Sequence, residues 1–259
     1  RADAAVEIRG WTPAGRGPEA ARAAGMVDAA PRSLADAVFE AELIVLAAPP
    51  LDCVWLLEEL AGPMRYARPE HATLTDVAST KAFIVARANE RGVPFVGGHP
   101  MAGRETAGYG AATDDLFDGR PWVVVPGQHA RPADVERVEW LARAVGARPI
   151  RMGAEAHDRA VAGISHLPLV LAAALVEAVA GRPDAPTEGW DVARLLAASG
   201  WRDMTRLARG DVEMGAGIAV SNAGELAGRI RAVRAVLDGW LADLDAAGGG
   251  PHEDAIARR

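Results

Sequence analysis

Short apolar segments alternate with segments of helical periodicity over residues 1–152 of the chain. The run Leu43–Leu46 is apolar on both faces, a pattern typical of a parallel strand that helices cover on both sides. Strands are predicted at residues 5–9, 43–48, 73–77, 94–97, 122–125 and 148–151, and helices at residues 18–25, 33–40, 51–61, 80–91 and 132–145. This alternation predicts a first domain of α/β class, a doubly wound parallel sheet over residues 1–152.

The β-rich pattern ends near Glu155, and an Ala- and Leu-rich helical pattern continues to about residue 246. We therefore predict an all-helical second domain over residues 153–246, followed by a flexible tail at residues 247–259. Its first helix, 155–180, is apolar around most of its circumference, which requires burial on more than one side. Pro168 predicts a kink within this helix, beside Ser165 and His166. Because polar residues and Pro168 interrupt the uncharged stretch 160–176, we expect a buried helix rather than a membrane span.

Charge and cysteine content narrow the function classes. The 28 basic and 35 acidic residues give a net charge of -7. The chain contains no run of like charges that could bind phosphates or anionic lipid. Nucleic acid and membrane surfaces are therefore excluded as expected partners. The single cysteine, Cys53, lies in an apolar pattern and cannot form an intramolecular disulfide. With no basic segment followed by an apolar core near the start, these features predict a cytoplasmic protein.

The Gly-rich segment 97–108 is the first candidate for chemistry. It contains one imidazole, His99, and one carboxylate, Glu105, in what we expect to be a loop after a strand. Glycines allow close approach of the backbone to a ligand, and an imidazole exchanges protons near neutral pH. The segment therefore predicts a proton-transfer site.

One expected motif is absent from the first domain. Dinucleotide-binding folds place Gly-x-Gly-x-x-Gly between the first strand and helix, but here the strand at 5–9 is followed by Gly10-Trp11-Thr12-Pro13. This stretch is typical of the end of a second strand, where the adenosine ribose is normally bound. We therefore expect a central strand and phosphate loop of about 25 to 30 residues upstream of Arg1. Thr12, with Arg16 nearby, leaves the choice between NAD and NADP open.

Five motifs in order resemble one family, the prephenate and arogenate dehydrogenases of tyrosine biosynthesis. They are Leu46–Pro50 (Leu-Ala-Ala-Pro-Pro), Asp76–Lys81 (Asp-Val-Ala-Ser-Thr-Lys), Gly98–Glu105, His157-Asp158 with Ser165–Pro168, and Trp201–Arg206. The resemblance covers nearly the whole chain. It implies a Rossmann-like domain, here without its first strand, and a helical domain that forms a homodimer. The implied active site lies between the two, and the implied reaction is NAD- or NADP-dependent oxidative decarboxylation.

The resemblance also assigns roles to individual residues. His99 matches the catalytic base, and Ser79 matches the serine that orients this histidine and contacts the substrate near the nicotinamide. Arg206 and His166 match substrate-binding residues, Asp203 is expected to hold a binding residue in place, and Glu105 to gate or tune the site. The expected cofactor-binding residues are Thr12, Ala48, Pro49, Pro50 and Ser79.

Each of these residues has a structural alternative. Ser79 could cap the helix at 80–91, and Arg206 could be a surface residue like its neighbours Arg202 and Arg209. His166 could be a core residue, Glu105 could form an exposed pair with Arg104, and His157 could be a contact at the domain boundary. No spacing of Cys, His and carboxylates suggests a metal site.

Several functions remain open from the sequence. Oxidation of prephenate to 4-hydroxyphenylpyruvate is the leading hypothesis, and conversion of arogenate to tyrosine is the close alternative. Gly215 stands where the family more often has a Trp after Met214, so details of the pocket are not carried over. A cofactor-free binding module is a third possibility, which intact His99, Ser79 and Arg206 oppose. Another hydroxyacid dehydrogenase is a fourth, but its interdomain catalytic Lys is absent.

Overall fold

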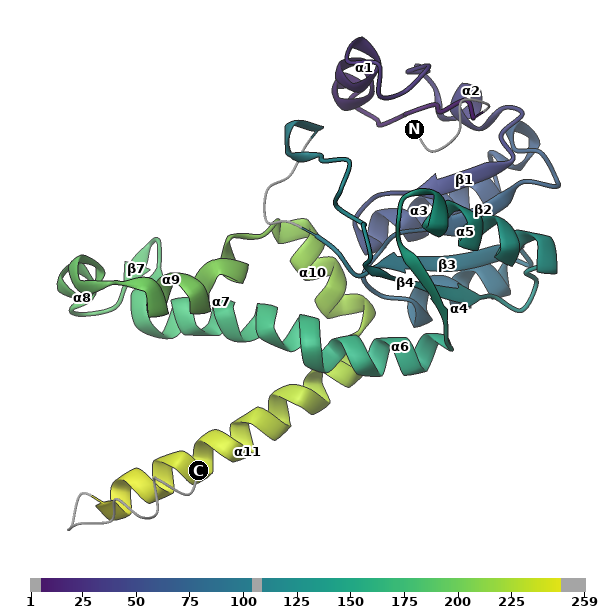
Figure 1. Ribbon diagram of the computed structural model, residues 1–259. Helices are drawn as coiled ribbons and strands as arrows, with labels where there is room; N and C mark the ends of the chain where they lie inside the picture. Colours follow the sequence, from purple (N-terminus) through teal and green to yellow (C-terminus); the bar gives the residue numbers. More distant parts are fainter. Residues whose placement is uncertain (1–5, 104–108, 248–259) are drawn as a thin grey trace.

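The computed structural model describes residues 6–103 and 109–247, and the described part of the chain contains a five-stranded sheet beside a group of helices (Figure 1). The strands are β1 (Leu43–Leu46), β2 (Thr73–Asp76), β3 (Phe95–Pro100), β4 (Pro121–Pro126) and β5 (Arg148–Arg151), in that spatial order. Strands β1, β2 and β3 are parallel, β4 is antiparallel to β3, and β5 is parallel to β4. The expected α/β class is confirmed, although the antiparallel pair means that the sheet is not wholly parallel.

Helices cover both faces of this sheet. Helices α3 (Pro50–Ala61) and α4 (Ala82–Glu90) pack on one face, where buried Leu57, Ile84 and Phe95 belong to one apolar cluster. Helix α5 (Pro132–Ala144) packs on the other face, where Val124 and Val138 belong to a second cluster. The two clusters account for the apolar pattern on both faces of the central strands.

The expected strand at 5–9 is wrong for the residues that the structure describes. Arg9 forms only an isolated parallel bridge with Ala29, and Asp28 and Ala29 donate backbone hydrogen bonds to the carbonyl of Ile8. A strand needs a hydrogen-bonding neighbour along its length, and here only a one-residue bridge forms. The segment carries α1 (Arg16–Ala23) and α2 (Leu34–Val38) and lies beyond the edge formed by β1 (Figure 1).

The helical part begins with α6 (Ala154–Val161) and α7 (Leu167–Ala180), which a π-helical turn at Ala162–His166 connects. The irregularity expected beside Pro168 thus takes the form of a widened turn. The remaining elements are β6 (Gly181–Arg182), β7 (Ala185–Pro186), α8 (Trp190–Leu196), α9 (Ser199–Thr205), a 3₁₀ turn (Arg206–Arg209), α10 (Val212–Ser221) and α11 (Ala223–Ala247). The expected helical second part is confirmed, although the short hairpin of β6 and β7 interrupts it where Gly181, with a positive φ of 74°, ends α7 in a turn.

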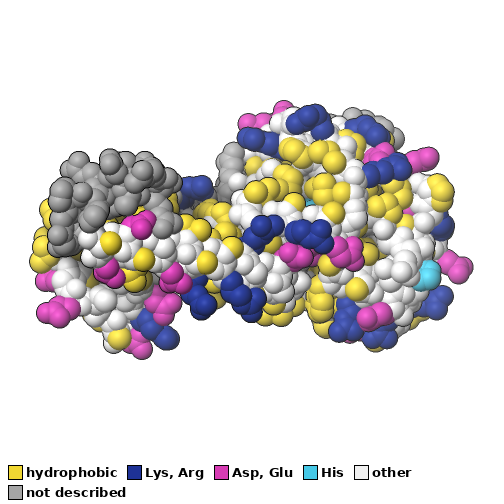
Figure 2. Space-filling view, turned by 90° about the horizontal axis from the view of Figure 1, so that it is seen from below, with side chains coloured by type: hydrophobic (Ala, Val, Ile, Leu, Met, Phe, Trp, Pro, Cys, Tyr) yellow, Lys and Arg dark blue, Asp and Glu magenta, His cyan; other side chains and the backbone are white. Residues whose placement is uncertain are grey.

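Apolar side chains remain exposed over this helical part. The stretch Ala154–Ala180 is long and apolar enough to cross a membrane, and only 22% of its most apolar window is buried. The expectation of a buried helix is therefore wrong for a single chain. In Figure 2, hydrophobic side chains are visible on the two wide regions of the molecule and on the narrow region between them. Exposed large apolar residues of the helices include Ile164, Val192, Leu195, Leu196, Val236, Leu237, Leu241 and Leu244.

Candidate active site

His99 lies within β3, where it is paired with Val123 of β4, so the expectation of a loop at this position is wrong. The two preceding glycines have a packing role. A Cβ at Gly98 would lie 2.5 Å from the backbone oxygen of Asp76, and one at Gly97 would lie 3.0 Å from Cδ of Lys81. Glycine is therefore needed here for close packing inside the protein rather than for approach to a ligand.

A buried ion pair lies beneath these glycines. Asp76 and Lys81 are both fully buried, and the Lys81 ammonium donates to Asp76 Oδ2. The backbone N–H of Gly98 donates to Asp76 Oδ1 over 3.0 Å, and that of Ala78 donates to Oδ2 over 3.1 Å. The pair thereby links the end of β2 to the backbone of β3 beside His99.

His99 contacts a second buried histidine. Its Nδ1 lies 2.7 Å from Nε2 of His157 on α6, and Nδ1 of His157 lies 2.7 Å from Oδ1 of Asp158. The two rings meet edge to face, with centroids 5.0 Å apart. The sequence allows His157 as a contact at the domain boundary, and the structure places it directly behind His99. The available signal is the adjacent His157-Asp158 pair, which is part of one of the five family motifs.

Asp158 also joins the helical part to the sheet part. Its carboxylate accepts hydrogen bonds from the backbone N–H of Lys81 (2.8 Å) and Ala82 (2.9 Å), at the start of α4. These bonds satisfy amides that have no partner within the helix and complement the positive end of its dipole. The alternative in which Ser79 caps this helix is therefore wrong, since α4 begins at Ala82 and Asp158 provides the cap.

His166, at the end of the π-helical turn, is buried close to this group. Nδ2 of Asn222 lies 3.1 Å from its Nδ1 and also donates to the backbone oxygen of Asp158 over 2.9 Å. Nε2 of His166 is buried and makes no hydrogen bond of ordinary geometry to the described residues. Burial lowers the pKa of His166 below its ordinary value, against opposing effects of Asp158 and of the nearby backbone of Ser79. A buried ring nitrogen whose contact with the backbone is poor can instead hydrogen-bond a ligand.

A cavity of about 680 Å³ opens in front of these histidines. Four predicted residues line it together: His99, Ser79, His166 and Arg206. Apolar side chains of Met101, Leu169 and Ile218 form other parts of its wall, and Gly215 also borders it. A Cβ at Gly215 would meet Leu169 only at 3.8 Å, so the cavity has room beside this glycine.

The other predicted residues lie elsewhere. Asp203 is exposed on α9 and does not line the cavity, and Glu105 lies outside the described residues. Thr12 accepts a hydrogen bond of 3.1 Å from the backbone of Gly15 before α1. Ala48 and Pro49 follow β1, and Pro50 begins α3. A Cβ at Gly217 of α10 would lie 3.1 Å from Cδ of Pro50, so α10 packs directly on the start of α3.

The electrostatic environment keeps His99 neutral. Burial holds the pKa of His99 well below its ordinary value of 6.5, and Lys81, His157 and His166 lower it further. A neutral imidazole has a lone pair available near neutral pH, so His99 can act as a general base.

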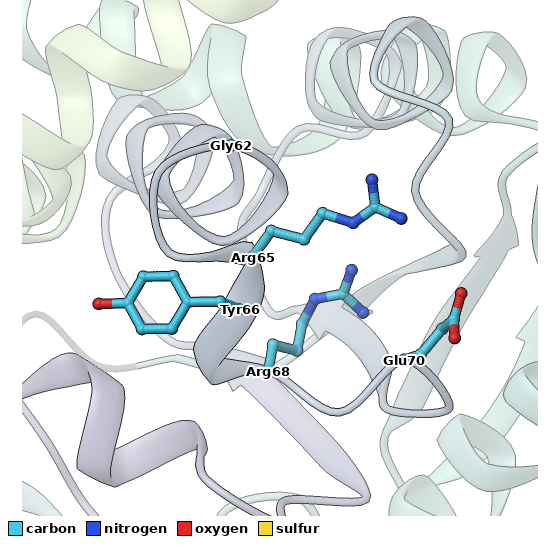
Figure 3. A pocket seen from close by; sticks show the side chains of 5 residues that line it. All are labelled: Gly62, Arg65, Tyr66, Arg68 and Glu70. Atoms are coloured by element: carbon cyan, nitrogen blue, oxygen red, sulfur yellow. The ribbon is translucent and has the colours of Figure 1, made fainter.

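A second hollow, of about 570 Å³, lies on the surface around the 3₁₀ turn Arg65–Ala67 (Figure 3). The side chains of Arg65 and Arg68 extend toward the same side as Glu70. Burial lowers the pKa of Arg68, with a further effect from Arg65. None of the predicted site residues lines this hollow. Among the described residues, no group of three or more His, Cys, Asp or Glu is placed to hold a metal ion.

Two family models match consecutive parts of the chain. Residues 3–151 match the prephenate dehydrogenase nucleotide-binding domain, and residues 153–247 match the prephenate dehydrogenase dimerization domain. The prephenate dehydrogenase of Bacillus subtilis is 32% identical over 225 residues, which are 85% of this chain and 57% of that protein. The cyclohexadienyl dehydrogenase of Zymomonas mobilis is 30% identical over 227 residues, covering 86% of this chain and 72% of that protein. The chain thus spans only part of these relatives.

Solved structures show the same fold. The prephenate dehydrogenase of Aquifex aeolicus, in complex with hydroxyphenyl propionate and NAD+, aligns with a TM-score of 0.83 at 24% identity, over 100% of this chain and 88% of that one. The arogenate dehydrogenase of Synechocystis aligns with a TM-score of 0.70 at 31% identity, over 93% of this chain and 84% of that one. With both parts of the chain matched by its models, this protein belongs to the prephenate dehydrogenase family.

Proposed function

We propose that the protein oxidises prephenate with a nicotinamide cofactor, NAD or NADP, and releases carbon dioxide to give 4-hydroxyphenylpyruvate in tyrosine biosynthesis. The observation that carries this proposal is the convergence of His99, Ser79, His166 and Arg206 on one cavity, in a member of this family. His99 and Ser79 come from the sheet part, and His166 and Arg206 come from the helical part. The cavity therefore combines an uncharged base with groups suited to bind an anion.

His99 supplies the base for this reaction. Since its pKa is depressed by burial, its ring is neutral at pH 7 and can take the proton of the ring hydroxyl. The bound nicotinamide would supply the hydride acceptor. Ser79 lines the cavity beside His99 and can hydrogen-bond the same hydroxyl, which would orient it. Once the ring carbonyl has formed, loss of carbon dioxide is driven by aromatisation.

The carboxyl edge of the parallel strands is the expected binding position for a dinucleotide cofactor. Strands β1 and β2 are parallel in register, with Leu46 opposite Asp76, so Ala48–Pro50 and Ser79 leave the sheet at the same carboxyl edge. Ligands of open α/β sheets bind at this edge. We infer that Ala48, Pro49, Pro50 and Ser79 face the cofactor there, and that Thr12 contributes on the adenosine side.

Arg206 and His166 are suited to the substrate's carboxylates. A guanidinium can hold a carboxylate through two parallel hydrogen bonds, and Nε2 of the buried His166 makes no hydrogen bond of ordinary geometry to the described residues. The apolar wall of Met101, Leu169 and Ile218 suits a six-membered ring. Glu105 and Asp203 keep the supporting roles proposed from the family resemblance.

Arogenate is the second candidate substrate, because the 31% identical Synechocystis protein is an arogenate dehydrogenase. The two substrates differ in a keto or an amino group on the side chain. A cofactor-free binding module is disfavoured, since a buried neutral base directed at a cavity has no use in such a module.

The helical part supports a homodimer. Leu195 and Leu196 of α8 are 78% and 79% exposed, and Leu237 and Leu241 of α11 are also exposed in the single chain. An apolar surface of this kind is typical of a protein interface. The matched model for residues 153–247 is that of a dimerization domain.

Steady-state rates of the purified full-length protein test the proposed function. Prephenate and arogenate are each assayed with NAD and with NADP, and we expect turnover of prephenate to exceed that of arogenate. His99→Asn should lower kcat by about 10²- to 10⁴-fold with little change in KM, as expected for loss of a general base. The exposed His129→Asn serves as the matched control. Turnover of neither substrate by the unmodified protein would overturn the proposal.

A further inference from the structure

We propose that His157 and Asp158 are positioning residues for His99: they fix its tautomer and take over the positive charge that it acquires as a base. The proposal rests on the function proposed above for His99. It assigns a role to two residues of α6 that do not line the cavity and that are almost completely buried behind His99.

The direction of the hydrogen bonds follows from Asp158. Its carboxylate has three donors around it, the backbone N–H groups of Lys81 and Ala82 and Nδ1 of His157. An ionised carboxylate only accepts hydrogen bonds, so three donors match the ionised form. Nδ1 of His157 must therefore carry a proton, and in the neutral ring its Nε2 carries the lone pair.

This assignment fixes the tautomer of His99. The lone pair on Nε2 of His157 accepts a hydrogen bond of 2.7 Å, so Nδ1 of His99 carries the proton. Nε2 of His99 is thus left as the lone-pair acceptor that this residue offers to the cavity. The opposite tautomer would place a proton where the mechanism needs a base.

The contacts from His99 through His157 to Asp158 also allow the positive charge that forms during the reaction to move next to a carboxylate. When Nε2 of His99 takes the proton of the substrate hydroxyl, the ring becomes cationic in a site where burial and Lys81 oppose a positive charge. Transfer of the Nδ1 proton to Nε2 of His157 returns His99 to neutrality. The cation then lies on His157, whose Nδ1 is 2.7 Å from the Asp158 carboxylate. One proton enters the pair at His99 Nε2, and no proton is lost.

Asp158 also ties this chain of contacts to the backbone near Ser79. The carboxylate that orients His157 caps α4, which follows Lys81 directly and begins three residues after Ser79. A purely structural role as a helix cap would leave the protonation of His99 unchanged. The tautomer and the pH dependence of turnover therefore distinguish the two roles.

The first test is independent of activity. Long-range ¹H–¹⁵N correlation spectra of the ¹⁵N-labelled full-length protein, without substrate at pH 7, report which ring nitrogens carry protons. We expect His99, assigned by the loss of its signals in His99→Asn, to be protonated at Nδ1 only. A proton on Nε2 of His99 would overturn the proposal, whether or not the protein turns over prephenate.

The second test is His157→Gln. Its side-chain oxygen can still accept from His99, but it cannot take a proton. We expect kcat to fall about 10- to 100-fold with KM unchanged. The acid limb of the kcat profile should move to lower pH, because the cation must stay on His99, where burial and Lys81, the two largest causes of its low pKa, oppose it. The variant also loses the smaller pKa-lowering effect of His157, which acts in the opposite direction.

His129→Gln is the matched control and should behave as the unmodified protein. A folded His157→Gln variant with unchanged kcat, or with a reduced kcat and an unmoved acid limb, would overturn the proposal. Absence of turnover in the unmodified protein would instead count against the proposed function, and the tautomer measurement would still decide the role of His157.

Discussion

The side-chain amide of Asn222 lies 3.1 Å from Nδ1 of His166. The same nitrogen donates to the backbone oxygen of Asp158, which can only accept and therefore fixes the orientation of the amide. Nδ1 of His166 must then accept, so its neutral ring carries the proton on Nε2. This donor makes no hydrogen bond of ordinary geometry to the described residues, so it can bind a carboxylate or carbonyl of the proposed substrate.

Asn222→Asp should reverse this arrangement. A carboxylate would draw the proton of His166 to Nδ1 and leave Nε2 as an acceptor that repels an anionic substrate. We expect KM for prephenate to rise about 10-fold or more, which corresponds to loss of one hydrogen bond of about 1.4 kcal/mol, with a smaller effect on kcat. Asn89→Asp is the matched control, because Asn89 accepts through its oxygen from Gln128. An unchanged KM in a folded variant would remove His166 from substrate binding.

Arg206→Ala should chiefly raise KM for the dicarboxylate. Loss of a charge-assisted pair costs about 1.5–3 kcal/mol, which is about 10- to 100-fold in affinity. Arg202→Ala, an exposed neighbour that does not line the cavity, is expected to leave KM unchanged. Equal effects of the two substitutions would assign the carboxylate contact to another residue.

The unfolding free energy should fall as the pH drops below about 6.5. The pKa values of His99 and His166 are lowered by burial, so below their ordinary value of 6.5 the unfolded chain binds more protons than the folded one. Their contribution is complete above that pH and is lost as the pH falls. Each such histidine steepens the fall by up to about 1.4 kcal/mol per pH unit.

Denaturant unfolding between pH 5 and pH 8, a range of about three units around the ordinary histidine pKa, measures this slope. His99→Asn should make it shallower, whereas the exposed His129→Asn should not. Identical slopes for the unmodified protein and His99→Asn would contradict the burial of a neutral His99.

Gly98→Ala should destabilise the protein without touching substrate. Its Cβ would lie 2.5 Å from the backbone oxygen of Asp76, so β2 and β3 would have to separate. We expect a loss of about 1–3 kcal/mol in unfolding free energy, together with reduced kcat from displacement of His99. Gly153→Ala is the control, because a Cβ there meets nothing within 4 Å. Equal stability of the two variants would contradict the packing role of Gly98.

Leu195→Glu should weaken the proposed homodimer. Leu195 is 78% exposed in the single chain, and a carboxylate at an apolar interface has no partner. Sedimentation equilibrium should show a dimer for the unmodified protein and an increased monomer fraction for the variant. Tyr66→Glu, at an 81% exposed position of the sheet part, should leave the dimer intact. A monomeric unmodified protein would refute the dimer itself.

Apolar periodicity predicted the helices and strands whose own residues show which of their faces are buried. The strand expected from residue 43 begins at Leu43, and the helix expected at 51–61 spans Pro50–Ala61, because each pattern reflects the faces on which its own residues are covered. The segment 5–9 has strand propensity but forms only a bridge, since a strand depends on a neighbour that its own sequence does not encode.

Residue type and family resemblance together predicted the four residues that line the cavity. They did not predict the contact of His99 with His157, because these residues are 58 positions apart and their approach depends on how α6 packs on the sheet. Gly97 and Gly98 were correctly singled out, but for the wrong reason. Their neighbours are Asp76 and Lys81 of the protein interior, and only the three-dimensional structure reveals that packing.

The π-helical turn at Ala162–His166 has a consequence for the place of His166 in the helical part. Such a turn accommodates one residue more than a turn of α-helix within about the same rotation about the helix axis. The extra residue is therefore absorbed inside the turn, and α7 continues from α6 with its faces unchanged. Deleting one residue there would close the turn to ordinary α-helix and change which side chain stands beside Asn222, where His166 now lies, while the rest of α7 kept its position.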